Sequence, residues 1–570
     1  MIAGGDVMKR ALVAALVVVA VAAGVFYGRR DRVQPAPEPS PAAVELVGAT
    51  LLDGLGDYSF PVTTSSPEAQ RWFNQGLMLA YGFNHDAAER SFLKATELDP
   101  GCAMCWWGAA LVLGPHVNSG MEPANNAKAW ERLQSAIALA PQSTEREQAF
   151  IRALSARYAE NPPEDRRPLD EAYAASTGQL AAERPDDLDA AVFHAEAMMD
   201  LQPWDYYDAQ LRPKGNTAQV VSQLESVMAR NPDHPGALHL YVHAVEASAE
   251  PQRGVAAADR LRELIPGSGH LVHMPAHIYS RVGRWHDAVL ANQKAIAADD
   301  AYLATCRGNV QGLYPLGYVP HNHHFLWFAA SMEGASEVAR DAALQTAARV
   351  NLPELMRQPG YEGLQNYWMT PWFDRVRFGR WDEIAAGANP APDLPYVTAI
   401  WHYAQAMAAL RQERMEPANE HYAALAKLAA DPAFEKMMVW DRYPLSLSAH
   451  IAERTVFAEL ALARGDRDAA IAALREAVTI EDSIPYDEPP GWHAPVRQTL
   501  GVAMLAAGQP VEAEAVYREE LKRNPSNGWS LRGLAESLRA QKRSREAAET
   551  EQLLAAAWVN ADMQPAASRL

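Results

Sequence analysis

A repeated helix-pair pattern constrains this chain more than any other feature of its sequence. The clearest unit spans residues 68–100 and reads EAQRWFNQGLMLAYGFNHDAAERSFLKATELDP, with apolar residues at the spacing of two short amphipathic helices. Gly76 and Ala88 are small enough for the two helices to cross closely, and Phe92 fills the groove between neighbouring units. Pro100 predicts the end of the second helix, because proline cannot continue the helical hydrogen-bond ladder.

The same pattern recurs along most of the chain. Pro232 and Pro266 stand 34 positions apart as helix terminators. Further units are marked by Tyr279, Gly283, Ala288 and Ala295; by Gly334 and Ala339; by Ala458, Ala461, Gly465, Ala470 and Ala477; by Gly501, Leu505, Gly508, Ala513, Tyr517 and Pro525; and by Leu531, Ala535, Leu538 and Ala547. Such a chain predicts an all-α fold, because each helix pair buries its apolar face only against its neighbours.

The first unit carries its key residues at the offsets of a known repeat. These residues are Trp72, Gly76, Ala88, Phe92, Ala95 and Pro100. With them the chain resembles tetratricopeptide repeat (TPR) proteins of bacterial type, from Gln70 to about Leu554, with histidine-rich central repeats. The resemblance implies a right-handed superhelical solenoid in which the first helix of each repeat lines a concave groove. It implies little about activity, because one fold hosts many functions.

Departures from the repeat predict the domain organisation. We expect a signal peptide or single-pass anchor at 1–32, a Pro-rich linker at 33–60, an N-terminal array at 61–350 with His-rich repeats at 235–345, an irregular insertion at 351–398, a C-terminal array at 399–560 and a tail at 561–570. Irregular stretches rich in Pro, Gly and aromatic residues fall at 161–169, 202–215, 303–319, 352–381 and 484–492. We predict that these are ordered aromatic loops that cover one face of the solenoid.

The N-terminal segment predicts membrane targeting. An uncharged run from Ala11 to Gly28 follows Lys9 and Arg10, and more arginines follow it. The run is close to the minimum length that crosses a bilayer. Because it ends in arginines, we favour an uncleaved single-pass anchor in the cell membrane, with the body in the periplasm or otherwise outside the cytoplasm. Export after signal cleavage is the alternative.

Charge and cysteine content exclude several classes of protein. The 51 basic and 70 acidic residues give a net charge of −19, which disfavours a general nucleic-acid binder. Three cysteines are too few for a disulfide framework. Cys102 and Cys105 have CxxC spacing, but Trp106 stands where covalent haem attachment requires histidine, so we expect a packed pair or an incidental disulfide.

Histidines concentrate in three neighbouring repeats. Of the 17 histidines, ten lie between His234 and His324. The residues expected to face the groove are His239, His243 and Glu246 in one repeat, His270, His273 and His277 in the next, and His321 and His324 in the third. Residues four apart lie one above the other on a helix, so His239 with His243 and His273 with His277 form ready ligand pairs. Helices packed about 8–10 Å apart allow pairs from adjacent repeats to converge on the same ion.

This pattern predicts a transition-metal site. Neutral imidazole is the commonest protein ligand for such metals, and burying many rings without a ligand is costly. We expect a divalent or redox-active ion, Cu, Fe, Zn or Mn, and the number of histidines permits two ions. Glu246 and Glu196 are candidates for a metal ligand or a general base, and more readily for a partner that holds an imidazole N–H.

Two features support a simpler interpretation of the histidines. Some of the rings can simply stack on Trp327 or Phe328. Pro275 lies between His273 and His277, where it either kinks the helix or begins one and leaves His273 in a loop.

Two functions of different class follow from these observations. The first is a metalloprotein that handles metal or acts on a small molecule in a groove closed by the aromatic loops. The second is a scaffold without catalytic activity that binds a protein or peptide in the concave groove. The clustered histidines and long aromatic insertions favour the metalloprotein, because a peptide groove requires neither; the sequence leaves catalysis open.

Overall fold

The computed structural model describes residues 49–306 and 313–570. The predicted membrane-targeting segment at 1–32, most of the predicted linker and part of the predicted loop at 303–319 lie outside these residues. Within the described part of the chain, no helix is both long enough and apolar enough to cross a bilayer.

The described residues form α-helices almost throughout. The N-terminal helices are α2 (Pro67–Tyr81), α3 (His85–Leu98), α4 (Ala103–Leu111), α5 (Asn126–Leu139), α6 (Glu145–Leu154), α7 (Arg167–Glu183), α8 (Leu188–Asp200) and α9 (Thr217–Arg230). The central helices are α10 (Pro235–Glu246), α11 (Val255–Leu264), α12 (Gly269–His273), α13 (Pro275–Arg281), α14 (Trp285–Thr305), α15 (Val319–Glu333) and α16 (Ser336–Arg349). Four short helices follow: α17 (Pro353–Met356), α18 (Leu364–Trp368), α19 (Thr370–Arg377) and α20 (Trp381–Ala386).

The C-terminal helices complete the array. They are α21 (Pro395–Arg411), α22 (Met415–Ala429), α23 (Ser446–Ala463), α24 (Arg467–Ser483), α25 (Val496–Ala506), α26 (Pro510–Arg523), α27 (Gly528–Ala540) and α28 (Ser544–Ala557). An antiparallel ribbon of β1 (Met438–Val439) and β2 (Tyr443–Pro444) precedes α23. The short turns are η1 (Pro123–Asn125), η2 (Ala140–Gln142), η3 (Pro251–Gly254), η4 (Tyr314–Tyr318) and η5 (Pro432–Lys436).

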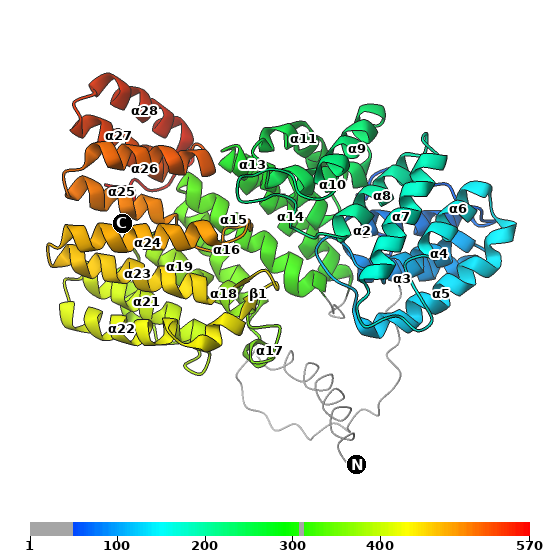
Figure 1. Cartoon of the computed structure of the whole chain (residues 1–570), viewed down its shortest axis with the longest axis horizontal. Helices are drawn as coiled ribbons and strands as arrows, with labels where there is room; N and C mark the ends of the chain where they lie inside the picture. Colours follow the sequence, from blue (N-terminus) through cyan, green and yellow to red (C-terminus); the bar gives the residue numbers. More distant parts are fainter. Residues whose placement is uncertain (1–48, 307–312) are drawn as a thin grey trace, which may run out of the picture. The chain divides into compact units, whose positions relative to one another are not determined.

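Consecutive helices pack side by side along the chain (Figure 1). Each helix from α2 to α11 contacts the next one in sequence, and so does each helix from α21 to α28. Gly465 and Gly508 end α23 and α25 with positive φ angles of 81° and 73°, a conformation that favours glycine. The predicted all-α array of stacked helix pairs is confirmed.

Phe92 on α3 lies at the crossing of the first helices. Its side chain is fully buried. A Cβ atom added at Gly76 on α2 would lie 2.8 Å from the Phe92 ring, and one added at Gly108 on α4 would lie 2.5 Å from it. Both glycines are therefore needed for the close approach, as predicted for Gly76.

Replacing Phe92 with alanine is expected to lower the free energy of unfolding by about 3–5 kcal/mol, because it leaves a cavity between three helices. Val511→Ala serves as the control, since Val511 is 61% exposed, and its effect is expected to stay within about 0.5 kcal/mol. Denaturant unfolding of the two variants measures both values. A loss below about 1 kcal/mol for Phe92→Ala would contradict this packing.

The C-terminal repeats contact the central helices through buried indoles. The Trp529 N–H donates to the Ser331 carbonyl oxygen over 2.8 Å, and the Trp558 N–H donates to that of Met332 over 3.2 Å. Both acceptors lie on α15. These contacts tie α27 and α28 to a helix about 200 positions earlier in the sequence, which local sequence patterns do not reveal.

Two predicted boundaries differ from the structure. The predicted linker at 33–60 overlaps the folded body, because Leu55 and Phe60 are buried and the Tyr58 hydroxyl donates to Asp189 Oδ1 over 2.7 Å. The predicted irregular insertion at 351–398 contains helices α17 to α20 and the start of α21. The CxxC pair forms a disulfide between Cys102 and Cys105, one of the two outcomes expected for it.

Candidate metal centre

Three neighbouring helix pairs carry the clustered histidines. Helix α10 supplies His239, His243 and Glu246 from one face, since these residues are spaced by four and three positions. Helix α10 begins where the side chain of His234 accepts a hydrogen bond from the backbone N–H of Ala237, and Pro235 occupies the first turn.

The second and third pairs contribute through α12, α13 and α15. Helix α12 ends at His273 and α13 begins at Pro275, but Met274 between them keeps helical φ and ψ angles of −49° and −37°. His273 is therefore the last residue of α12 rather than part of a loop, and its ring centre lies 4.7 Å from that of His277 on α13. His321 on α15 completes the group, with its ring centre 4.7 Å from that of His273.

The structure brings six of the seven predicted histidine ligands into two groups of three. Triad A consists of His239, His243 and His270, and triad B consists of His273, His277 and His321. Within each triad, one ring nitrogen of each histidine lies within 4.8 Å of the others. A third group, His243, Glu246 and His277, meets the same criterion and links the two triads.

Hydrogen bonds fix the protons on four of these rings. His239 Nδ1 donates to the Tyr81 carbonyl oxygen over 2.6 Å. His273 Nδ1 lies 2.7 Å from Asn292 Oδ1, and the Asn292 amide nitrogen donates to the Ala288 carbonyl oxygen. That second bond identifies Oδ1 as the acceptor, so His273 carries its proton on Nδ1.

Glu246 fixes the protons on the remaining two rings, those of His243 and His277. Its Oε1 accepts from His243 Nδ1 over 2.8 Å, and its Oε2 accepts from His277 Nδ1 over 2.6 Å. The Tyr486 hydroxyl donates to the same Oε2 over 3.0 Å. One carboxylate thus orients one histidine of each triad, which is the role of an outer partner at many metal sites.

The ring nitrogens left without protons face one another. His273 Nε2 lies 2.7 Å from His277 Nε2 and 3.0 Å from His321 Nε2. In triad A, His239 Nε2 lies 3.1 Å from His270 Nε2. His243 Nε2 is buried and has no hydrogen-bond partner among residues 49–306 and 313–570. In each triad, two rings whose protons are on Nδ1 therefore have an Nε2 lone pair without a proton.

Burial favours the neutral form of four of these rings. It lowers the pKa of His239, His270, His273 and His321 well below the usual histidine range, and a neighbouring histidine lowers each pKa further. Burial alone would raise the pKa of Glu246, but His277 and the hydrogen bonds from His243 and His277 hold it below its usual range. The site therefore combines these neutral imidazoles with one buried carboxylate. Histidine binds a metal ion in its neutral form.

Aromatic side chains, two of them from predicted loops, cover the triads. Trp204, from the loop at 202–215, lies edge-on to His243 with a ring-centre separation of 5.2 Å. Tyr318, in the π-helical turn before α15, lies 4.6 Å from the His270 ring. Phe83 contacts His239 at 4.5 Å, and Phe325 contacts His273 at 5.1 Å. Triad residues on α10, α12 and α13 are consequently at most 2% exposed.

Two predicted site residues lie apart from both triads. The His324 ring stacks on Trp327 with an interplanar angle of 15° and also contacts Tyr367, so it serves packing, as the simpler interpretation proposed for some rings. Glu196 on α8 lies outside all three candidate ligand groups. Burial raises the pKa of Glu196 to about 7, opposed by Arg157.

Sequence reasoning missed two residues of the segment 484–492. Tyr486 contacts Glu246, and Glu488 Oε1 lies 3.5 Å from His277 Nδ1. Burial, Glu246 and Asp487 raise the pKa of Glu488 above its usual range. The sequence YDEPPGWHAP stands out for its prolines and aromatics, but nothing in it indicates contact with a helix 240 positions earlier.

A pocket of about 180 Å³ adjoins triad B. Phe325, Tyr486 and Glu488 line it, and each also contacts a triad histidine or Glu246. Glu481 lies at the same pocket, and burial and Glu520 raise its pKa to about 8.

Glu481 is expected to make stability depend on pH. A carboxyl whose pKa is higher in the folded state stabilises the fold below its unfolded pKa, and that contribution is lost as the pH rises through the folded value of about 8. Glu481→Gln stays neutral and is expected to flatten the fall in melting temperature between about pH 5 and pH 9. The exposed Glu512→Gln is the control, and parallel curves for wild type and Glu481→Gln would contradict the shift.

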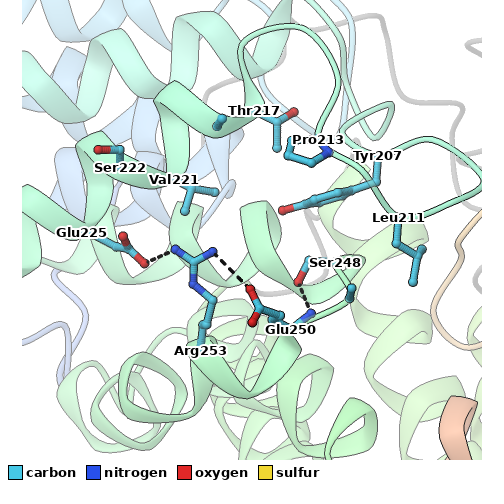
Figure 2. Close-up of a pocket in the computed structure, with 12 residues that line it drawn as sticks. Tyr207, Leu211, Pro213, Thr217, Val221, Ser222, Glu225, Ser248, Glu250 and Arg253 are labelled. Carbon is cyan, nitrogen blue, oxygen red and sulfur yellow. Dashed lines mark hydrogen bonds and ion pairs between the residues drawn. The ribbon is translucent and has the colours of Figure 1, made fainter.

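A second hollow of about 310 Å³ lies at the ends of α9 and α10 (Figure 2). Tyr207 and Leu211 lie on one side of it, and Arg253 lies between Glu225 and Glu250. The Tyr207 hydroxyl donates to the Ala244 carbonyl oxygen over 2.7 Å. The charged side chains of this hollow, Glu225, Glu250 and Arg253, are paired with one another. This pairing distinguishes the hollow from the site at the histidines.

Comparison with known proteins agrees with the helix-pair architecture. Residues 69–102 match the tetratricopeptide repeat family. The chain therefore carries a tetratricopeptide repeat at these residues. It is similar to the structure of the APC/C hetero-tetramer Cut9-Hcn1, with 15% identity over 86% of this chain and 76% of that chain and a TM-score of 0.29. It is also similar to a human IFIT1 dimer with PPP-AAAA, with 13% identity over 86% of this chain and 91% of that chain and a TM-score of 0.31. No curated protein sequence matches the chain.

The triads occupy the first helices of three successive helix pairs. These pairs are α10 with α11, α12 and α13 with α14, and α15 with α16. The register implied by the TPR resemblance therefore places the histidines on the correct helices. It does not foresee that aromatic loops bury them, which leaves these rings unable to contact a peptide in an open groove.

Proposed function

We propose that this TPR protein binds two transition-metal ions, one at each histidine triad, and uses its aromatic loops to enclose them. The observation that carries the proposal is the pair His273 and His277. Both rings hold their protons on Nδ1, yet their Nε2 atoms lie 2.7 Å apart. Two lone pairs at that distance repel each other unless a cation, either a proton or a metal ion, lies between or beside them.

The geometry of the remaining nitrogens supports a metal ion as that cation. Imidazole nitrogens bound at about 2.0–2.1 Å to one ion lie about 2.9–3.4 Å apart at ordinary coordination angles. The separations of 3.0 Å in triad B and 3.1 Å in triad A fall in this range, and the 2.7 Å between His273 and His277 lies just below it. A set of neutral nitrogen donors favours Zn, Cu or Fe over Mg or Ca, and Mn is the less favoured of the metals that the sequence suggested.

Metal analysis of the full chain tests the proposal. The protein would be purified without a polyhistidine tag or chelator, reconstituted separately with Zn, Cu, Fe and Mn, desalted and measured for metal per chain. We expect two equivalents of at least one metal. Fewer than about 0.2 equivalents of every metal after reconstitution would contradict the proposal and return the histidines to a packing role.

A protein-binding scaffold without catalytic activity is the second candidate. The family match favours it, because stacked TPR helix pairs most often bind partner proteins or peptides in their groove. The hollow beside Tyr207 and Leu211 offers one surface for such contact (Figure 2). This function requires neither triad, so a chain that binds no metal in the reconstitution experiment would leave the scaffold as the better account.

The proposal also keeps the predicted membrane attachment. The uncharged run from Ala11 to Gly28 supports a single-pass anchor that holds the body outside the cytoplasm. Fractionation of cells that express the full chain tests this: recovery in the membrane fraction supports an anchor, and recovery of a shortened chain in the soluble exported fraction supports signal cleavage.

A further inference from the structure

The pocket beside triad B has aromatic walls and an incompletely paired acid. Phe325, Phe328, Tyr486 and Trp492 supply the aromatic surface. Glu488 lines the same pocket, and its side chain is 10% exposed. Its Oε2 atom is buried and accepts no hydrogen bond from any residue that the structure describes. A buried carboxyl oxygen without a hydrogen-bond partner is costly, and a ligand that donates a hydrogen bond to it would remove that cost.

The basic side chains at this pocket are already engaged. Arg281 donates through Nε to the Glu246 carbonyl oxygen over 3.0 Å and through its terminal nitrogens to two further backbone carbonyls. Arg497 and Arg523 both pair with Asp482, at 2.6 Å and 2.9 Å. An anionic ligand would therefore find no free cationic partner among these three residues, whereas a cationic ligand would find Glu488.

We propose that this pocket binds a small organic ammonium ion, with its head group at Glu488 and its apolar body against the aromatic walls. An ammonium group donates the hydrogen bond that Glu488 lacks, and aromatic faces attract cations. The inference rests on the proposed function in one respect: it makes triad B the metal site next to the bound amine, since Glu488 lies 3.5 Å from His277.

Calorimetric titration with benzylammonium, with benzoate and benzyl alcohol as comparison probes, tests the ligand class on the full chain. We expect saturable binding of one benzylammonium per chain and at least tenfold weaker binding of the other two. Glu488→Gln is expected to weaken benzylammonium binding at least tenfold, and Ile484→Trp, which fills the pocket from its rim, is expected to do the same. Glu512→Gln, an exposed acid-to-amide change on α26, is expected to leave binding unchanged.

Two results would overturn the inference: equal affinity for benzoate and benzylammonium, or unchanged affinity in both Glu488→Gln and Ile484→Trp. The position beside triad B has a separate readout. Cu(II) bound there should accelerate relaxation of the benzyl ring protons, and His273→Ala should remove that acceleration while the calorimetric binding persists. Amine binding to a metal-free chain would thus uphold the pocket while the metal proposal fails. Metal binding at the triads without amine binding would uphold the metal proposal and contradict the amine pocket.

Discussion

Replacing His273 with alanine is expected to remove one of the two bound ions and to leave the other in place. His273 Nε2 is the atom of triad B that approaches both other histidines, at 2.7 Å and 3.0 Å. Its loss leaves two imidazoles, so we expect affinity at triad B to fall at least about a hundredfold, or about 2.8 kcal/mol. Helical content should stay nearly unchanged, because α14 and α15 keep their packing.

Matched variants make this result specific. His239→Ala is expected to remove the ion of triad A alone, and the double variant is expected to bind neither ion. His324→Ala is the control, because this ring is also buried but stacks on Trp327 instead of joining a triad. Two equivalents of metal in the double variant, or loss of metal in the His324 variant, would contradict the assignment of ligands.

Replacing Glu246 is expected to weaken the binding of both metal ions at once. Its two oxygens accept from His243 in triad A and from His277 in triad B, so a single carboxylate holds one ring of each in the required tautomer. In Glu246→Gln the amide nitrogen faces one Nδ1–H and forces that ring to turn or change tautomer. Outer partners of this kind are typically worth about 10- to 100-fold in metal affinity, and we expect a loss of that size at each site.

Competition titrations with a chelator measure the two affinities. Glu196→Gln is the matched control, since the sequence also nominated Glu196 but the structure places it outside the ligand groups. Tyr486→Phe should have a smaller effect than Glu246→Gln, because it removes one of three hydrogen bonds to the carboxylate. Loss of affinity at only one triad in Glu246→Gln would contradict the shared role.

The sequence predicts the helices that carry the site because two periodicities coincide. The helix-pair repeat brings α10, α12 with α13, and α15 together as neighbours, and the four-residue spacing places His239 with His243 and His273 with His277 on one face. His324 obeys nearly the same spacing from His321, but the ring is drawn to Trp327 and Tyr367. The spacing of residues in the sequence determines which face of a helix they share. It does not determine which neighbours their side chains contact.

The surroundings of the triads were beyond the reach of sequence patterns. Besides Glu246, which the sequence nominated, the acceptors that fix the protons are the Tyr81 carbonyl and the Asn292 amide, and neither belongs to a motif. Tyr486 and Glu488 belong to the C-terminal part of the chain, which contacts α15 through Trp529 and Trp558. Such contacts depend on how the whole array of helices returns on itself, which a local repeat does not encode.

Anomalous X-ray diffraction from crystals of the metal-loaded chain, recorded on both sides of the metal absorption edge, tests the central claim most directly. The account predicts two anomalous peaks, one among the Nε2 atoms of His239, His243 and His270 and one among those of His273, His277 and His321. The absence of a peak at both positions would contradict it. A single peak between Glu246 and the Nδ1 atoms of His243 and His277 would also contradict it, because those atoms would then bind metal instead of orienting the two rings.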